Sequence, residues 1–184
     1  MTTGPRSPAR LALRGATAPL HARVDALFAD GLRSARDYRV YLRGMQAPAA
    51  FAWQAWNHPQ RLAWLDADLA ALGLAPLPPG PGLRVHCAGA AAGALYVLEG
   101  SMLGARTLLD DVRTLGWSAQ RGAAFLHGHA GDDAGARWRT FTRHLEQADF
   151  GVDETDAMLA AAAAAFASVE HDFRRAGSLE PENA

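Results

Sequence analysis

The sequence is poor in cysteine: its 184 residues include one, Cys87. A single cysteine excludes an internal disulfide framework and a metal site built from several thiolates. It suits a reducing compartment, so we expect a cytoplasmic protein. An excess of charge is missing as well, because the formal net charge is −1 at pH 7. Nothing in this balance favours nucleic acid or an anionic membrane as a partner.

Long apolar runs are also missing. The most apolar segment, Cys87 to Leu98, is about half the ~20 residues that a membrane-spanning helix needs, and Glu99 ends it. The first ten residues lack the apolar stretch of a signal peptide. No segment alternates apolar and polar residues as a half-buried strand does. The chain is 49% hydrophobic and 20% charged, which is typical of a globular domain.

Helical periodicity recurs instead and predicts a single all-α domain over residues 9–177, with about seven or eight helices. The flanking residues 1–8 and 178–184 are expected to be flexible. Proline and glycine in 75–82, and glycine in 127–133, predict two loops.

Caps and breaks mark the expected helices. Ser34 and Asp37 resemble a capping box. Thr17 is expected to cap the first main helix, and a lead-in helix would bend into it at Pro19. Pro48 predicts a kink in the next helix. The expected helices cover about 17–28, 34–56, 59–72 after a break at 57–59, 85–115, 118–125, 134–147 and 153–176.

A histidine on the first helix has the neighbours of a supported metal ligand. Asp25 follows His21 at i+4 and Arg14 precedes it at i−7, so the three side chains share one helix face. A carboxylate that accepts from one ring nitrogen orients a histidine whose other nitrogen binds a metal. An ordinary surface ion pair gives the same spacing, and this helix alone favours the ion pair.

Two glycines one turn apart, Gly100 and Gly104, lie in the segment GALYVLEGSMLGAR (93–106). Each glycine costs a helix roughly 1 kcal/mol relative to alanine, so the bare backbone needs an explanation. Close packing against another helix is the commoner one. The alternative is a flat ligand that approaches the main chain. This stretch by itself favours helix packing.

The segments LRGATAPLH (13–21) and YVLEGSMLGAR (96–106) together resemble the biliverdin-producing haem oxygenases, most strongly the bacterial, bacteriophytochrome-associated type. The later stretches GAAFLHGHAG, ARWRTFTRHL and AAAAFASVEHDF are similar to the second half of that family. The resemblance covers about residues 8–175. It implies a single-domain helical bundle that holds haem between a proximal helix and a kinked distal helix.

The resemblance also implies roles for individual residues. His21 would be the proximal iron ligand, with Asp25 accepting a hydrogen bond from it. The distal wall would contain Gly100, Ser101 and Gly104. The remaining haem contacts that the resemblance implies are Arg14 at one propionate, Arg139 and Arg143 at the other, and Tyr96 and Phe166 in the lining of the cavity.

The implied activity is O2- and electron-dependent cleavage of haem to biliverdin, Fe(II) and CO, with haem as both cofactor and substrate. It requires an electron donor such as a ferredoxin or a reductase, which ascorbate replaces in vitro, and a bacteriophytochrome is one recipient of the biliverdin. Two residues depart from the family pattern. Ala105 stands where many members have a second glycine, and Ser101 stands where the animal-type enzymes have a distal aspartate. A haem-binding protein without turnover and a helical interaction module without haem therefore stay open as alternatives.

Other residues give weaker signals. Cys87 could act as a nucleophile, as in the helical thiaminase-like enzymes, but a small buried cysteine is commoner. Met102 could approach the iron from the distal side, but packing is the default. The five tryptophans are expected in the core. A divalent metal could bind to a set of side chains in the predicted loop, namely His127, His129, Asp132 and Asp133, although the glycines there favour a mobile loop.

Overall fold

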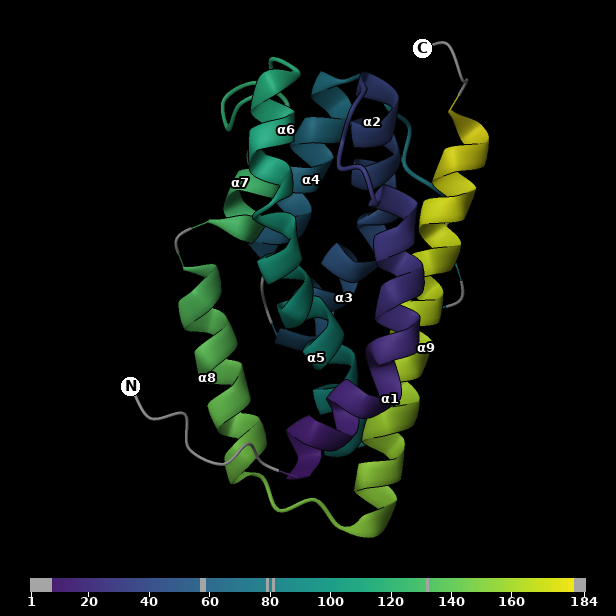
Figure 1. The fold of residues 1–184 in the computed structure, drawn as a ribbon, viewed down its shortest axis with the longest axis vertical. Coiled ribbons are helices and arrows are strands. Elements are labelled where there is room, and N and C mark those ends of the chain that lie inside the picture. Colours follow the sequence, from purple (N-terminus) through teal and green to yellow (C-terminus); the bar gives the residue numbers. More distant parts are fainter. Residues whose placement is uncertain (1–7, 57–58, 79, 81, 132, 181–184) are drawn as a thin grey trace.

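The structure, a computed structural model, describes residues 8–56, 59–78, 80, 82–131 and 133–180, and of residues 52–56 it describes the backbone alone. This part of the chain is helical, with β-type pairing limited to isolated bridges of Ser118 with Arg121 and Gly122. The predicted all-α fold is confirmed. The helices are α1 (Pro8–Asp25), the 3-10 turn η1 (Ala26–Phe28), α2 (Ala35–Gly44), α3 (Gln46–Trp56), α4 (Pro59–Ala71), α5 (Ala88–Ala105), α6 (Leu108–Thr114), α7 (Ala124–Ala130), α8 (Ala134–Gln147) and α9 (Val152–Leu179) (Figure 1).

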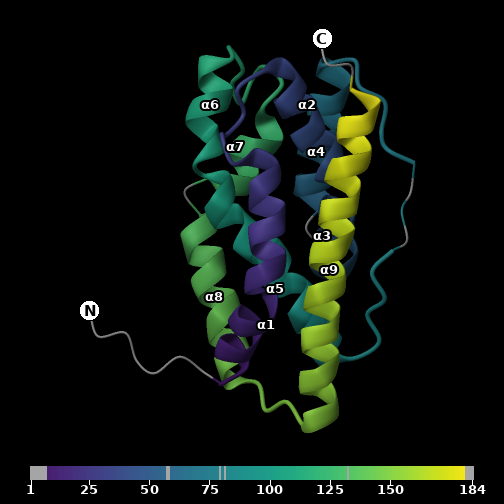
Figure 2. The same cartoon turned by 45° about the vertical axis from the view of Figure 1, so that its right-hand side comes forward.

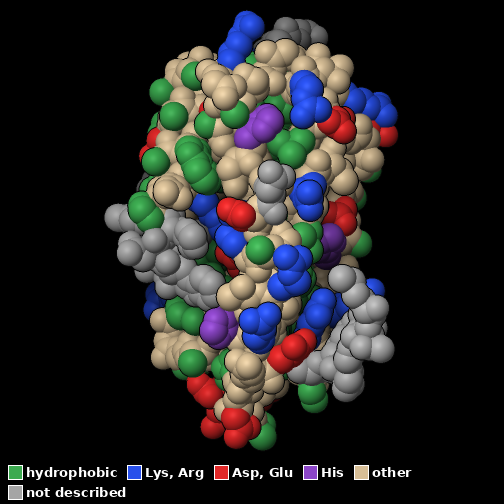
Figure 3. All heavy atoms as spheres, turned by 90° about the vertical axis from the view of Figure 1, so that its left-hand side faces the viewer, with side chains coloured by type: hydrophobic (Ala, Val, Ile, Leu, Met, Phe, Trp, Pro, Cys, Tyr) green, Lys and Arg blue, Asp and Glu red, His purple; other side chains and the backbone are tan. Residues whose placement is uncertain are grey.

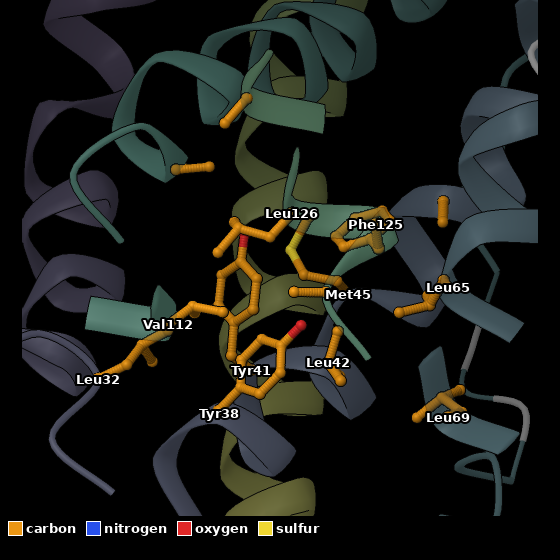
Figure 4. Close-up of a cluster of buried hydrophobic side chains, with 14 of the residues drawn as sticks. Leu32, Tyr38, Tyr41, Leu42, Met45, Leu65, Leu69, Val112, Phe125 and Leu126 are labelled. Atoms are coloured by element: carbon orange, nitrogen blue, oxygen red, sulfur yellow. The ribbon is translucent and has the colours of Figure 1, made fainter. Parts of the chain in front are cut away.

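The long helix α9 organises the bundle. α5, α1 and α2 all pack along it, and α8 lies on the other side of α5 and α1 (Figures 1 and 2). At one end of the molecule α2, α4, α6 and α7 gather around a core that contains Tyr38, Leu42, Leu65 and Phe125 (Figure 4). A second apolar cluster joins α1, α5, α8 and α9. Among the described helices, none is both long enough and apolar enough to cross a membrane.

α5 and α9 approach each other closely. A Cβ atom on Gly89 would overlap the backbone of Glu154, and one on Gly93 would overlap the carbonyl of Met158. Glycine is required at both positions because α9 backbone occupies the space of a side chain. Small residues on α5 thus set the distance between the two central helices.

The helix predicted over 85–115 is interrupted in the structure. α5 ends at Ala105 and α6 begins at Leu108. At the break, both the amide and the hydroxyl of Thr107 donate to the carbonyl of Gly104, the hydroxyl at 2.8 Å. Threonine hydroxyls that bond nearby carbonyls compete with regular helix, which explains the turn.

Two other boundaries differ because of proline and of tertiary contacts. The helix predicted over 34–56 breaks at Met45, so that Pro48 occupies the first turn of α3, where its missing N–H costs nothing. The predicted helix 118–125 and the loop 127–133 are wrong, because helix α7 occupies Ala124–Ala130. Its first amides, those of Ala124 and Phe125, donate to the buried carboxylate of Asp68 in α4.

The first and last helices also differ from their predicted bounds. α1 runs from Pro8 through Pro19 as one helix that changes direction after its first turns (Figure 1). α9 was expected to end before Gly177 but continues to Leu179, and the side chain of Glu180 is buried against Arg43. The predicted end of this helix before Gly177 is therefore too early. The predicted break at residues 57–58 and the side chains of Trp53 and Trp56 lie outside the described residues.

Candidate functional site

His21 extends from α1 with one ring nitrogen held and the other free. Its Nδ1 lies 2.8 Å from Oδ2 of Asp25, and the two side chains are 58% and 65% exposed. The ring of Phe166 from α9 meets the imidazole edge-on, with the centroids 5.6 Å apart. No residue in the described part of the chain bonds Nε2. A histidine that donates from Nδ1 to a carboxylate presents its Nε2 lone pair to a metal.

The two glycines of the distal motif leave one face of α5 bare. A Cβ atom on Gly104 would meet no described atom within 4 Å, and one on Gly100 would meet the ring of Trp138 at 3.7 Å, an ordinary contact. Gly89 and Gly93, by contrast, are required by the contact with α9. Helix packing therefore explains the first glycine pair of α5 but not the second.

The helices of the two motifs, α1 and α5, lie near one another without packing along their lengths. Both contact α9 extensively, whereas their contacts with each other are sparse. They share the apolar cluster that includes Leu13 of α1 and Leu98 of α5. Direct contact between α1 and α5 therefore does not fill the space beside the glycines.

Aromatic side chains join α5 to α8 beside the glycine face. The rings of Tyr96 and Trp138 lie 5.5 Å apart, and Phe141 follows 5.8 Å from Trp138. The guanidinium of Arg10 lies over the Trp138 ring at 5.8 Å. Trp138 was expected as an ordinary core residue, but it is half-buried and forms the neighbour of Gly100.

The three arginines expected to contact propionates are exposed. Arg14 lies on α1, and Arg139 and Arg143 lie one turn apart on α8. None of the three forms an ion pair with a described residue, so their guanidinium groups are available to an anionic partner. Figure 3 shows the face of α7 and α8, where basic side chains lie across the middle with acidic ones among them, and further acidic side chains lie at the lower end.

Ser101 points to a buried histidine that the sequence placed in a loop. The Ser101 hydroxyl donates to the carbonyl of Leu98 at 2.8 Å and lies 3.0 Å from Nε2 of His129. His129 is 1% exposed, its ring stacks on Phe125, and its Nδ1 has no partner in the described protein. Burial lowers the pKa of His129 well below its usual value, and the charges of Arg61 and Arg137 lower it further. The imidazole is therefore neutral.

A buried charged cluster lies next to this pair. Nη2 of Arg61 donates to Oε1 of Glu99 at 2.8 Å, and both side chains are almost fully buried. Arg61 and Arg137 also donate to the sulfur of Met102, at 3.1 Å and 2.9 Å. Met102 is thereby held in the packed interior, as its default interpretation predicted. Arg61 and Arg137 were not predicted from the sequence, where the one available signal was the charged Glu99 inside an apolar helix.

The remaining alternatives are not supported by local geometry. Cys87 caps α5, where its sulfur accepts from the amide of Ala90 at 3.4 Å, and it is half-buried rather than fully buried as expected. The residues that the structure describes contain no group of three or more side chains that could hold a metal ion. His129 faces Ser101, and Asp132 lies outside the described residues.

Comparisons with known proteins agree with this arrangement. The family model described as "Heme oxygenase" matches residues 87–175. No curated protein sequence matches the chain. A crystal structure of the NO- and CO-bound haem oxygenase from Neisseria meningitidis has the same fold, with a TM-score of 0.74, 24% sequence identity, and coverage of 96% of this chain and 97% of that one. The family match covers slightly less than half of the chain, in the part that contains the distal motif, and together with the shared fold it supports a relationship to the haem oxygenases.

Proposed function

We propose that the protein is a haem oxygenase, which cleaves haem with O2 and electrons to biliverdin, Fe(II) and CO. The observation that carries the proposal is the state of His21: Nδ1 is held by Asp25, while Nε2 is accessible and unbonded within the described chain. A histidine in this state fits the fifth coordination position of haem iron. The match of residues 87–175 to the haem oxygenase family model supports the same assignment.

The described residues fit haem on the proximal side. His21 would ligate the iron, and the Phe166 ring beside it would contact the porphyrin. The exposed guanidinium groups of Arg14, Arg139 and Arg143 would neutralise the propionates. When bound, haem supplies the iron that activates O2 and is itself the ring that is cleaved.

On the distal side the chain supplies space and hydrogen bonds. The bare backbone at Gly100 and Gly104 would keep side chains away from the neighbouring face of a bound haem. Ala105 stands where many family members have glycine, but its methyl group is buried in the core near α2 and α7, away from this face. The structure thus gives no reason to expect that Ala105 narrows the site.

A haem-binding protein without turnover is the second candidate. Ser101 favours it, because a hydroxyl replaces the carboxylate of the animal-type enzymes and the described structure turns it toward Leu98 and His129. A helical interaction module without haem is less well supported, since no described helix comes close to Gly104 and a Cβ atom on Gly100 would meet the Trp138 ring at an ordinary distance only.

One experiment separates these functions. Haemin is added to the purified protein, the Soret band is recorded, and ascorbate or a reductase is then supplied under air. We expect a shifted Soret band followed by the absorption of biliverdin. No change on adding haemin would overturn haem binding and turnover together, and a stable Soret band would leave only the binding protein.

The partners of the reaction remain predictions. The chemistry needs an external electron donor, for which a ferredoxin or a reductase is expected, and a bacteriophytochrome is one acceptor of the product. The expected cytoplasmic location rests on the single cysteine.

A further inference from the structure

A purely apolar ring at the position of His129 would leave no buried polar atom without a hydrogen bond. It is buried on α7, its ring stacks on Phe125 at a centroid distance of 5.1 Å, and Nδ1 has no described partner. An unpaired buried nitrogen destabilises the folded state. Phenylalanine would keep the stacking and avoid this penalty, so packing alone does not explain the histidine.

The one side-chain hydrogen bond of His129 connects it to the distal helix. Its Nε2 lies 3.0 Å from Oγ of Ser101. Because the Ser101 hydroxyl donates its proton to the carbonyl of Leu98, Oγ accepts, and Nε2 of His129 carries the hydrogen. Ser101 lies about 60° round the helix axis from Gly104, directly beside the bare glycine face.

The surroundings keep this histidine neutral. The charges of Arg61 from α4 and Arg137 from α8 both act on it, and Glu99 of α5, a carboxylate of the same cluster, is already bonded to Arg61. Arg137 also donates to the backbone carbonyl of His129 at 2.9 Å, which fixes the end of α7. A proton on His129 would add a further positive charge beside the buried Arg61 and the half-buried Arg137.

We propose that His129 is a positioning residue of the haem site: its neutral imidazole fixes the orientation of the Ser101 hydroxyl beside the Gly100–Gly104 face. The inference rests on the proposed function, since Ser101 matters to chemistry only if haem occupies that face. His129 itself acts through Ser101 and contacts no reacting atom.

The hydrogen bond is tested first in haem-free protein. Nitrogen-15 NMR of the His129 ring should show one neutral tautomer, with the hydrogen on Nε2, from pH 7 to pH 5. Ser101→Ala should shift the Nε2 signal. Ordinary titration of His129 in this range, or ring signals that are unchanged in Ser101→Ala, would overturn the proposal.

The second arm asks whether the pair acts on bound haem. The ferrous protein is loaded with CO, and the C–O stretching band is recorded for Ser101→Ala, His129→Phe and the double variant. We expect both single variants to shift the band in the same direction and the double variant to add no further shift. Additive shifts, or a shift in Ser101→Ala alone, would overturn the inference.

Two further variants distinguish positioning from general damage. His129→Gln retains an amide that reaches Ser101 and should return the band toward the wild-type position. His144→Gln removes an exposed histidine from α8 and should leave the band unchanged. A wild-type chain that binds no haem would overturn the proposed function itself, whereas haem binding with uncoupled variants would overturn only the role of His129.

Discussion

Nε of Arg23 donates to Oε2 of Glu170 at 2.9 Å and so ties α1, two residues beyond His21, to the middle of α9. Arg174 of α9 bonds the other carboxylate oxygen, Oε1, at 3.0 Å. The helix of the candidate iron ligand is therefore held to the central helix by a carboxylate between two guanidinium groups.

This carboxylate predicts a loss of stability in acid. The hydrogen bonds from Arg23 and Arg174 hold the pKa of Glu170 below its ordinary value of 4.5. Its contribution is therefore complete above pH 4.5 and is lost as the pH falls through the lower, folded-state pKa. Urea unfolding at pH 7, 4.5 and 3 should show a smaller acid loss for Glu170→Gln than for the wild type. Identical losses would contradict the prediction.

His21→Ala should abolish the histidine-ligated haem spectrum while the fold survives, because the side chain is mostly exposed. Asp25→Ala should weaken haem binding by roughly 10–100-fold, the usual effect of removing the partner of a metal-bound histidine. Haemin titration followed at the Soret band measures both. His171→Ala, at an exposed position on α9, is the control. An unchanged spectrum in His21→Ala would show that another residue is the ligand.

Alanine at two glycines of the same helix should have opposite effects. Gly104→Ala should stabilise haem-free protein by up to about 1 kcal/mol through helix propensity, and impair haem binding or turnover. Gly93→Ala should destabilise by about 1–3 kcal/mol, because its methyl group overlaps the Met158 carbonyl. Denaturant unfolding and haemin titration of both variants test the pair. Destabilisation by Gly104→Ala would indicate that its face is packed after all.

The buried ion pair predicts a large cost for removing one partner. Glu99→Gln leaves the charge of Arg61 unpaired in the interior and should destabilise the protein by about 3–5 kcal/mol. Replacement of both, as Arg61→Met with Glu99→Leu, should cost less because no buried charge of the pair remains. Urea unfolding of the wild type, Glu99→Gln and the double variant tests this prediction. A loss of stability in the double variant that equals or exceeds that of Glu99→Gln would contradict it.

His129 predicts a second dependence on pH. Because its pKa is lower in the folded protein than in the unfolded chain, protonation below pH 6.5 favours the unfolded chain. The stability of the folded protein should therefore fall as the pH drops below 6.5, by at most about 1.4 kcal/mol per pH unit. His129→Phe should remove this slope between pH 6.5 and 5. A slope that persists in the variant would assign it to another group.

The sequence predicted those features that depend on neighbours along the chain. The capping box of Ser34 and Asp37 is present, and Asp25 holds His21 at the predicted spacing. Helix α7 was missed because its N-terminal cap is Asp68, a residue of α4 more than fifty positions earlier. No local pattern contains that contact.

The use of the two glycines likewise could not be decided locally. Gly93 and Gly100 lie in the same predicted helix, and α9 contacts the backbone at Gly93 alone of the two. The partner of Ser101 was hidden for the same reason, because His129 comes from α7, whose existence depends on Asp68. Roles set by nearby positions were predictable, and roles set by a distant helix were not.

The division of α5 into a packed and an open half also has a mechanical meaning. Gly89 and Gly93 clamp its first turns to α9, whereas its last turn is unsupported on the glycine face and ends at a break. A flat molecule as large as a porphyrin can therefore displace the last turn of α5 without disturbing the contact with α9 at Gly89 and Gly93.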